Sequence, residues 1–213
     1  MDSPRGGPAR HSGGVSAVRE NFFVLMDPAW APGPRDEAPP FAAVLGLWPI
    51  LDHGGVGGFR TNPEYVPSGA GAPTDPIDAA LLAVAGTGTG LDQVRVLLRD
   101  CLVEVGVDDS GRPLIADSPD DLPCLMVATS ARNRGYAPAI PGWRTADLDD
   151  LIAVLDDDVD VLLNPGGPRM TRLTGGFVRA ALGLDDAEAA ALLTGAGARP
   201  RHLTVLPWAA DRP

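Results

Sequence analysis

Lysine is absent from this chain of 213 residues, so all 17 of its basic residues are arginines, set against 28 acidic residues and a net charge of -11. Proteins that bind nucleic acid need basic surfaces to displace counterions from the phosphates. The charge therefore argues against nucleic acid as a partner. Together with abundant alanine, glycine, proline and aspartate, the missing lysine indicates GC-rich coding rather than a function.

Cysteine and long apolar runs are also scarce. Cys101 and Cys124 are the only cysteines, too few for a disulfide framework or a closed thiolate metal site, so we expect free thiols in a reducing cytoplasm. No run approaches the roughly 20 apolar residues of a membrane span, and the first 20 residues hold no apolar segment of signal-peptide type. These absences predict a cytoplasmic protein without membrane insertion.

Motifs that carry chemistry are missing as well. The glycine-rich stretch 86–90 follows a predicted helix and lacks the lysine of a P-loop. The turn 108–111 lacks the alternating ligands and distal glutamate of an EF-hand. His11, His53 and His202 have no partners at ligand spacing. We therefore predict no catalytic residues, no cofactor and no metal, and a protein that is not an enzyme.

One acidic run leaves an alternative open. Asp156, Asp157, Asp158 and Asp160 lie close together in the chain, and clustered carboxylates can bind a divalent cation or act as acid and base. Consecutive aspartates cannot all point inward, which favours a solvated loop between a helix and a strand. A metal-dependent hydrolase using residues 156–160 stays as an alternative function.

The first half of the chain predicts a β segment followed by helices. Residues 1–19 are poor in apolar residues and predict a disordered arm. Residues 20–67 predict an N-terminal β segment, with a strand at FFVLM and a hairpin around residues 52–55. Asp75 and Pro76 predict the start of a helix that ends near Gly86. On the next helix, Leu91, Val94, Leu97 and Leu98 form the apolar stripe while Gln93 and Arg95 face water.

The second half alternates strands with helices. Strands are expected at residues 102–107, 112–116, 122–128 and 159–163, with Thr145 capping the helix between the last two. The sequence NPGGP at 164–168 predicts a turn. Thr174 predicts the start of a further helix, and Asp185 with Glu188 a capping box before another. Residues 184–213 form a C-terminal helix and strand extension. The fold class predicted is α+β, a mixed or mainly antiparallel sheet flanked by helices, with an N-terminal β-hairpin segment.

The order of these elements resembles a known family. The chain presents PTDPIDAALLAVA, a second helix, a DDSGRP hairpin, LPCLMVATS, the TADLDDLIAVL helix and VDVLLNPGGP. This order, over residues 72–183, is similar to the SseB N-terminal domain. The preceding DPAW, LGLWPI and FRTNPEYVPS look like the amino-terminal part of actinobacterial type VII secretion system-associated proteins that carry this domain. The family has no established catalytic residues to transfer.

The resemblance implies a non-enzymatic cytosolic adaptor that binds a type VII secretion substrate or component. Candidate protein-binding residues are aromatic residues and an arginine, types enriched at binding hot spots: Trp30, Trp48, Trp143 and Arg169. For Trp48 and Trp143 the pattern favours a core position, and Trp30, beside prolines, is the best surface candidate. An immunity protein that neutralises a co-encoded basic toxin through its acidic surface is the alternative from another class.

Overall fold

A computed structural model describes residues 21–30, 40–87, 90–194 and 203–207, the last segment in its backbone only. The predicted disordered arm 1–19 lies outside the described residues. The predicted fold class is confirmed: the described residues form an α+β fold with two sheets. None of the described helices has both the length and the apolar character that crossing a bilayer requires.

The small sheet has the strand order β10-β1-β2-β3, all antiparallel. It contains β1 (Asn21–Met26), β2 (Val44–Ile50), β3 (Arg60–Thr61) and β10 (Leu203–Pro207), with the short 3-10 helix η1 (Phe41–Ala43) before β2. The predicted β segment at 20–67 therefore contains a helical turn directly before β2. The C-terminal extension contributes β10, which pairs with β1, so the two ends of the described chain share one sheet.

The large sheet is mixed, with the order β7-β4-β6-β8-β9 and β5 paired to β6. Its strands are β4 (Val103–Val107), β5 (Ile115–Asp117), β6 (Pro123–Ala128), β7 (Gly142–Ala146), β8 (Asp160–Leu163) and β9 (Thr171–Leu173). Only the β6–β8 pair is parallel. Strand β7 was missed from the sequence: Thr145 lies in it, and Asp147 caps the following helix by accepting from the Asp150 amide.

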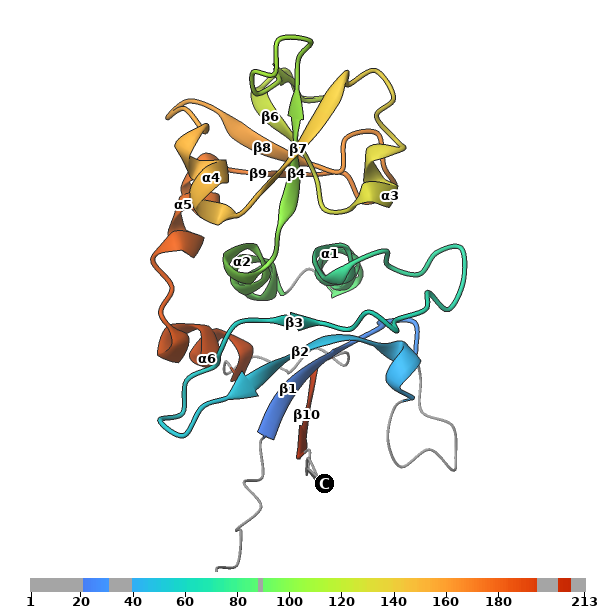
Figure 1. Ribbon diagram of the computed structural model, residues 1–213, viewed down its shortest axis with the longest axis vertical. Helices are drawn as coiled ribbons and strands as arrows, with labels where there is room; N and C mark the ends of the chain where they lie inside the picture. The colour runs from blue at the N-terminus through green and yellow to red at the C-terminus, as the bar shows by residue number, and fades with distance from the viewer. Residues whose placement is uncertain (1–20, 31–39, 88–89, 195–202, 208–213) are drawn as a thin grey trace, which may run out of the picture.

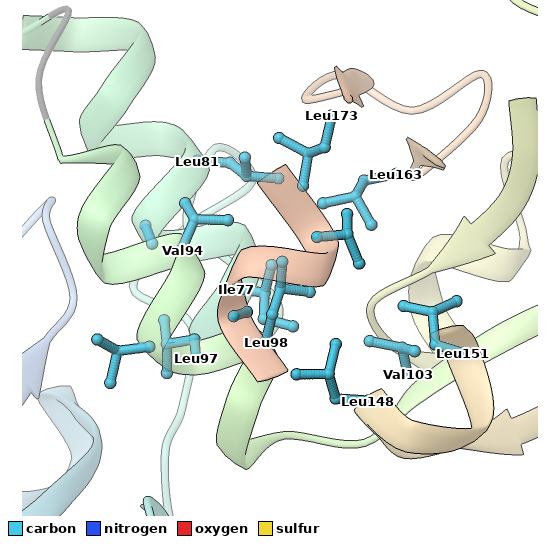
Figure 2. Close-up of a cluster of buried hydrophobic side chains, with 14 of the residues drawn as sticks. Ile77, Leu81, Val94, Leu97, Leu98, Val103, Leu148, Leu151, Leu163 and Leu173 are labelled. Carbon is cyan, nitrogen blue, oxygen red and sulfur yellow. The ribbon is translucent and has the colours of Figure 1, made fainter. Parts of the chain in front are cut away.

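Helices α1 (Pro76–Thr87) and α2 (Leu91–Asp100) form a layer between the two sheets (Figure 1). The remaining helices are α3 (Ala131–Arg134), α4 (Leu148–Ala153), α5 (Gly175–Leu182) and α6 (Asp186–Thr194). The predicted caps of α5 and α6 are confirmed, because Thr174 accepts from the Phe177 amide, and Asp185 and Glu188 bond each other's amides at 2.8 and 3.0 Å. One apolar cluster runs from Trp48 through both helices to Val161, and Figure 2 shows its centre.

Burial on two sides corrects the predicted orientation of α2. Gln93 is buried rather than water-facing, and the Nε atom of Arg95 is buried without a hydrogen-bond partner. Leu91, expected in the core, is 43% exposed. A one-sided stripe is the usual rule for a surface helix, but α2 carries a sheet on each side, so its polar residues had to be partly enclosed.

Asp100 joins α2 to the small sheet. Its carboxylate accepts hydrogen bonds from the indole Nε1 of Trp48 at 2.9 Å and from the amide of Phe59 at 3.1 Å. Arg99 pairs with the same carboxylate at 2.7 Å. A buried indole needs such an acceptor, so the position of the small sheet on α2 is fixed by polar contacts as well as by packing.

A β-bulge in β2 decides which side chains face outward. The register passes from Leu25–Gly46 to Met26–Val44, so that Leu45 has no partner of its own. Residues on either side of a bulge change their alternation. As a result Leu45 and Trp48 both point into the core, while Val44 and Leu47 point to the opposite, outer face of the small sheet.

The bulge requires glycine at position 46. A Cβ atom there would collide with the ring of Phe59 and lie 2.5 Å from the carbonyl oxygen of Arg60. We predict that Gly46→Ala lowers the free energy of unfolding by about 1–3 kcal/mol, as overpacking does, measured by urea denaturation. Gly58→Ala is the control, since no atom lies within 4 Å of a Cβ at that position. Equal stability of the two variants would contradict this account.

Candidate functional site

A cluster of polar side chains lies where the parallel strands β6 and β8 end. Thr129 follows β6, Asn164 follows β8, and the start of α1 brings Asp75 against Thr129, which also bonds Asn164. We call these residues the polar cluster, which also includes Thr74, Asp78, Ser130, Asn133 and Arg169. The carboxyl ends of parallel strands commonly form ligand sites, so these strand ends are a candidate functional site.

Asp75 is the centre of the polar cluster. One carboxylate oxygen accepts from the Asp78 amide at 2.9 Å, which confirms Asp75 as the cap of α1. The other accepts from Thr129 Oγ1 at 2.8 Å, Thr74 Oγ1 at 2.8 Å and Asn133 Nδ2 at 3.1 Å. Burial raises the pKa of Asp75 above its usual value, with the nearby Asp78 carboxylate adding to the effect.

Asn164 opens the predicted NPGGP turn, in the left-handed conformation at a φ of 52°. Its Oδ1 accepts from the amide of Thr129 at 2.9 Å, which fixes the orientation of the side-chain amide. Its Nδ2 is buried and has no hydrogen-bond partner. Gly166, at a φ of 73°, packs against the carbonyl of Tyr136, where a Cβ would lie 2.6 Å from that oxygen. The turn is thus a close-packed part of the scaffold.

Arg169 joins this turn to α1. Its guanidinium donates to Asp78 at 2.6 and 2.7 Å, a paired geometry that raises the pKa of Arg169. The Asp78 side chain is 1% exposed and that of Arg169 13%. Arg169 was predicted to lie on a binding surface, whereas the structure engages its guanidinium with Asp78 inside the protein.

The side chains of the polar cluster form hydrogen bonds mainly with one another. The oxygens of both carboxylates are occupied by donors from the chain, and no histidine or cysteine belongs to the set. Across the described segments, no three histidine, cysteine or acidic side chains are grouped to hold a metal ion. We interpret the polar cluster as a structural joint between α1, β6 and β8.

The acidic run at 156–160 is dispersed in the structure. Asp160 lies in β8 and pairs with Arg172 at 2.5 Å while accepting from the Gly175 amide at 2.9 Å. Asp157 is fully exposed and lies 3.6 Å from Arg179. Asp156 and Asp158 are exposed as well. These side chains do not converge on one point.

A second candidate site is an apolar groove of about 270 Å³ on the outer face of the small sheet. We call it the outer groove. Aromatic and aliphatic side chains provide most of its walls, and Arg60 is its charged residue. It is lined by Phe22, Phe41, Val44, Gly46, Leu47, Arg60, Thr61, Asn62 and Pro63. The side chain of Phe41, one of the large apolar residues in this wall, is 42% exposed.

Asn62 holds the walls of the outer groove together. Its Nδ2 donates to the carbonyls of Phe41 and Val44, both at 2.8 Å, and its Oδ1 accepts from the Glu64 amide at 3.0 Å. The side chain is buried and its hydrogen bonds connect η1, β2 and the end of β3. The groove is thus preformed by the fold, as binding sites commonly are.

The three predicted tryptophans lie in different settings. Trp48 is 0% exposed and belongs to the core, so it cannot contact a partner. Trp143 is half-buried on β7 of the large sheet. Trp30 is half-buried and packs against the outer cluster of Phe22, Val24, Met26 and Val44, two of which line the outer groove.

The residues that line the outer groove were missed from the sequence. Phe41 and Arg60 fall in the predicted N-terminal β segment, and neither was predicted to bind. The one usable signal was a lone arginine following the apolar hairpin; the bulge that turns Leu47 outward left no mark in the sequence.

Comparison with family models, with curated proteins and with solved structures finds no match for this chain. The SseB resemblance therefore stays a prediction.

The buried ion pair of the polar cluster can be tested by truncation. We predict that Arg169→Ala lowers the free energy of unfolding by about 3–5 kcal/mol, because it leaves the buried Asp78 charge unpaired. Urea denaturation monitored by tryptophan fluorescence measures the change. The control is Arg112→Ala, which removes an exposed pair with Asp108 and should leave the midpoint unchanged. Similar losses in both variants would exclude a special role for Arg169.

The raised pKa of Asp75 predicts a pH dependence. The folded state binds this proton more tightly than the unfolded state, so the contribution of Asp75 is most favourable below its ordinary pKa of 3.8 and is lost as pH rises through the folded value. The stability of the native protein minus that of Asp75→Asn should therefore decrease as the pH rises above 3.8. The exposed Asp109→Asn controls for loss of one charge. A difference that grows with pH would refute the assignment.

Proposed function

We propose that this protein is a non-enzymatic adaptor that binds another protein through the outer groove. The observation that carries the proposal is the groove itself: a preformed apolar hollow with the half-exposed Phe41 at its wall, on a sheet face turned away from the core. Apolar pockets with few polar groups are typical of binding sites.

The polar cluster supports the non-enzymatic part of the proposal. Reaction chemistry needs a group free to exchange a proton or attack a substrate, and Asp75 and Asp78 are both engaged by donors of the chain. Burial raises the pKa of the Cys101 thiol, which disfavours the reactive thiolate. The proposed setting, a type VII secretion system, comes from the sequence resemblance, and the groove does not bear on it.

Exposed acids supply the case for the alternative, an immunity protein with a basic partner. Asp149, Asp150, Asp156, Asp157 and Asp158 are all exposed on α4 and the turn after it. A partner bound there would depend strongly on ionic strength, because exposed charges are screened by salt. Binding through the outer groove would depend on Phe41 instead. The two functions are therefore separable by one salt series and one substitution.

The adaptor proposal predicts that Phe41 is a binding hot spot. Random 12-residue peptides displayed on phage are selected on the immobilised full chain, and the affinity of enriched peptides is measured by fluorescence polarisation. Phe41→Ala should weaken binding roughly tenfold or more, as truncation of a central aromatic does. Thermal unfolding of the variant is expected to change little, since the side chain is already half exposed.

The matched control for this experiment is Tyr136→Ala. Tyr136 is 43% exposed, close to the 42% of Phe41, but lies beside the large sheet. The Tyr136→Ala substitution should leave the affinity for the peptide unchanged. Failure to enrich any peptide, or equal losses from both variants, would overturn the adaptor proposal.

A further inference from the structure

We propose that the segment received by the outer groove is an apolar peptide that carries one carboxylate, and that Arg60 pairs with this carboxylate. This inference rests on the proposed function and specifies the chemistry of the partner. It is drawn from three features of the groove: a guanidinium that forms no ion pair within the described residues, an apolar surrounding, and a sheet edge with little backbone left to pair.

Arg60 lies on the outer face, in the row of side chains that crosses the small sheet. The register pairs it with Leu47, and Leu47 with Val24 on β1. Residues directly opposite one another point to the same face. Leu47 and Val24 pack in the outer cluster, so Arg60 extends this apolar row to the sheet edge as its charged end.

The guanidinium of Arg60 is not used by the described part of the chain. Of the described arginines, six form ion pairs, namely Arg99, Arg112, Arg134, Arg169, Arg172 and Arg179. Arg60 is exposed and has no such partner there, although the chain holds 28 acidic residues against 17 basic ones. In a chain with this excess of acids, a cation left unpaired beside an apolar groove is available to a ligand.

The chemistry that suits this cation is a carboxylate. A guanidinium presents a planar fork of donors that matches the two oxygens of a carboxylate. Apolar walls lower the local dielectric and strengthen such a pair relative to one in open water. The net charge of -11 repels long acidic runs, so we expect a single carboxylate among apolar residues.

The edge of the sheet limits binding through the main chain. The Asn62 amide donates to Leu45 at 2.9 Å. By the alternation of an antiparallel ladder, the backbone groups of Thr61 therefore point to the open edge. Beyond it, Pro63 has no amide hydrogen to donate, and on the other side the Phe59 amide is taken by Asp100. A peptide added as a further strand would gain main-chain hydrogen bonds at Thr61 alone. Contacts between side chains must therefore provide most of the affinity.

The test is a double-mutant cycle on the full chain. A groove-dependent peptide from the phage selection is synthesised with its carboxylate and with the matching amide, as Glu or Gln, Asp or Asn, or a free or amidated C-terminus. Each form is titrated against the native protein, Arg60→Gln and Arg144→Gln by fluorescence polarisation. Arg144 is the matched control, because it is exposed on β7, an edge strand of the large sheet, and is likewise without an ion pair among the described residues.

We expect the amide peptide and Arg60→Gln each to weaken binding roughly tenfold, as for a hydrogen bond to a charged group. In combination they should lose no more than either alone, and Arg144→Gln should bind like the native protein. Selected peptides whose affinity needs Phe41 but ignores both Arg60 and the carboxylate would overturn this inference and leave the adaptor proposal standing. A failure to select Phe41-dependent peptides would overturn both.

Two other occupants are distinguished by further measurements. A concentration-dependent dimer in light scattering that Phe41→Ala abolishes would assign the groove to a second copy of this chain. Displacement of the peptide by oleate, with stronger binding of oleate than of any peptide, would assign it to a fatty acid. Either result overturns the inference of a protein segment.

Discussion

Helices α1 and α2 are packed on both sides by a sheet, and the rest of the structure depends on this constraint. A helix layer shared by two sheets must bury apolar side chains in two directions, and it does so in one continuous core from Trp48 to Val161. The inner face of the small sheet packs against these helices through Leu45 and Trp48. The position of the outer groove therefore depends on the apolar core that the small sheet shares with α1, α2 and the large sheet.

Polar contacts fix the positions that apolar packing leaves free. Asp100 orients the small sheet on α2 through Trp48 and the Phe59 amide. The polar cluster performs the corresponding task for α1, since Asp75 and the Asp78–Arg169 pair attach its first turn to the ends of β6 and β8. Buried charges are costly unless paired, which explains why these residues are so completely engaged with one another and so poorly suited to catalysis.

The polar cluster lies at the ends of two strands of the large sheet, whereas the outer groove lies on the small sheet. The carboxyl ends of β6 and β8, a common position for ligand sites in sheets with parallel strands, are occupied by side chains of the protein itself. The outer face of the small sheet carries the half-exposed ring of Phe41 and the charge of Arg60, which forms no ion pair within the described residues.

The sequence by itself determined the local elements, because their signals are local. Asp75, Thr174 and the Asp185–Glu188 box marked helix starts, NPGGP marked a turn, and apolar runs marked β1, β6 and β8. It also determined the α+β class. Tertiary structure alone decided that Gln93 is buried, that β7 pairs with β4, and that Arg169 points inward to Asp78, 91 residues away in the chain. It decided the outer groove as well. A bulge at Leu45 and Gly46 determines which face Leu47 points to. Strand pairing in the small sheet brings Phe22 and Arg60 to the same groove. Local chemistry fixes caps and turns, whereas the facing of a side chain depends on which distant segment packs against it.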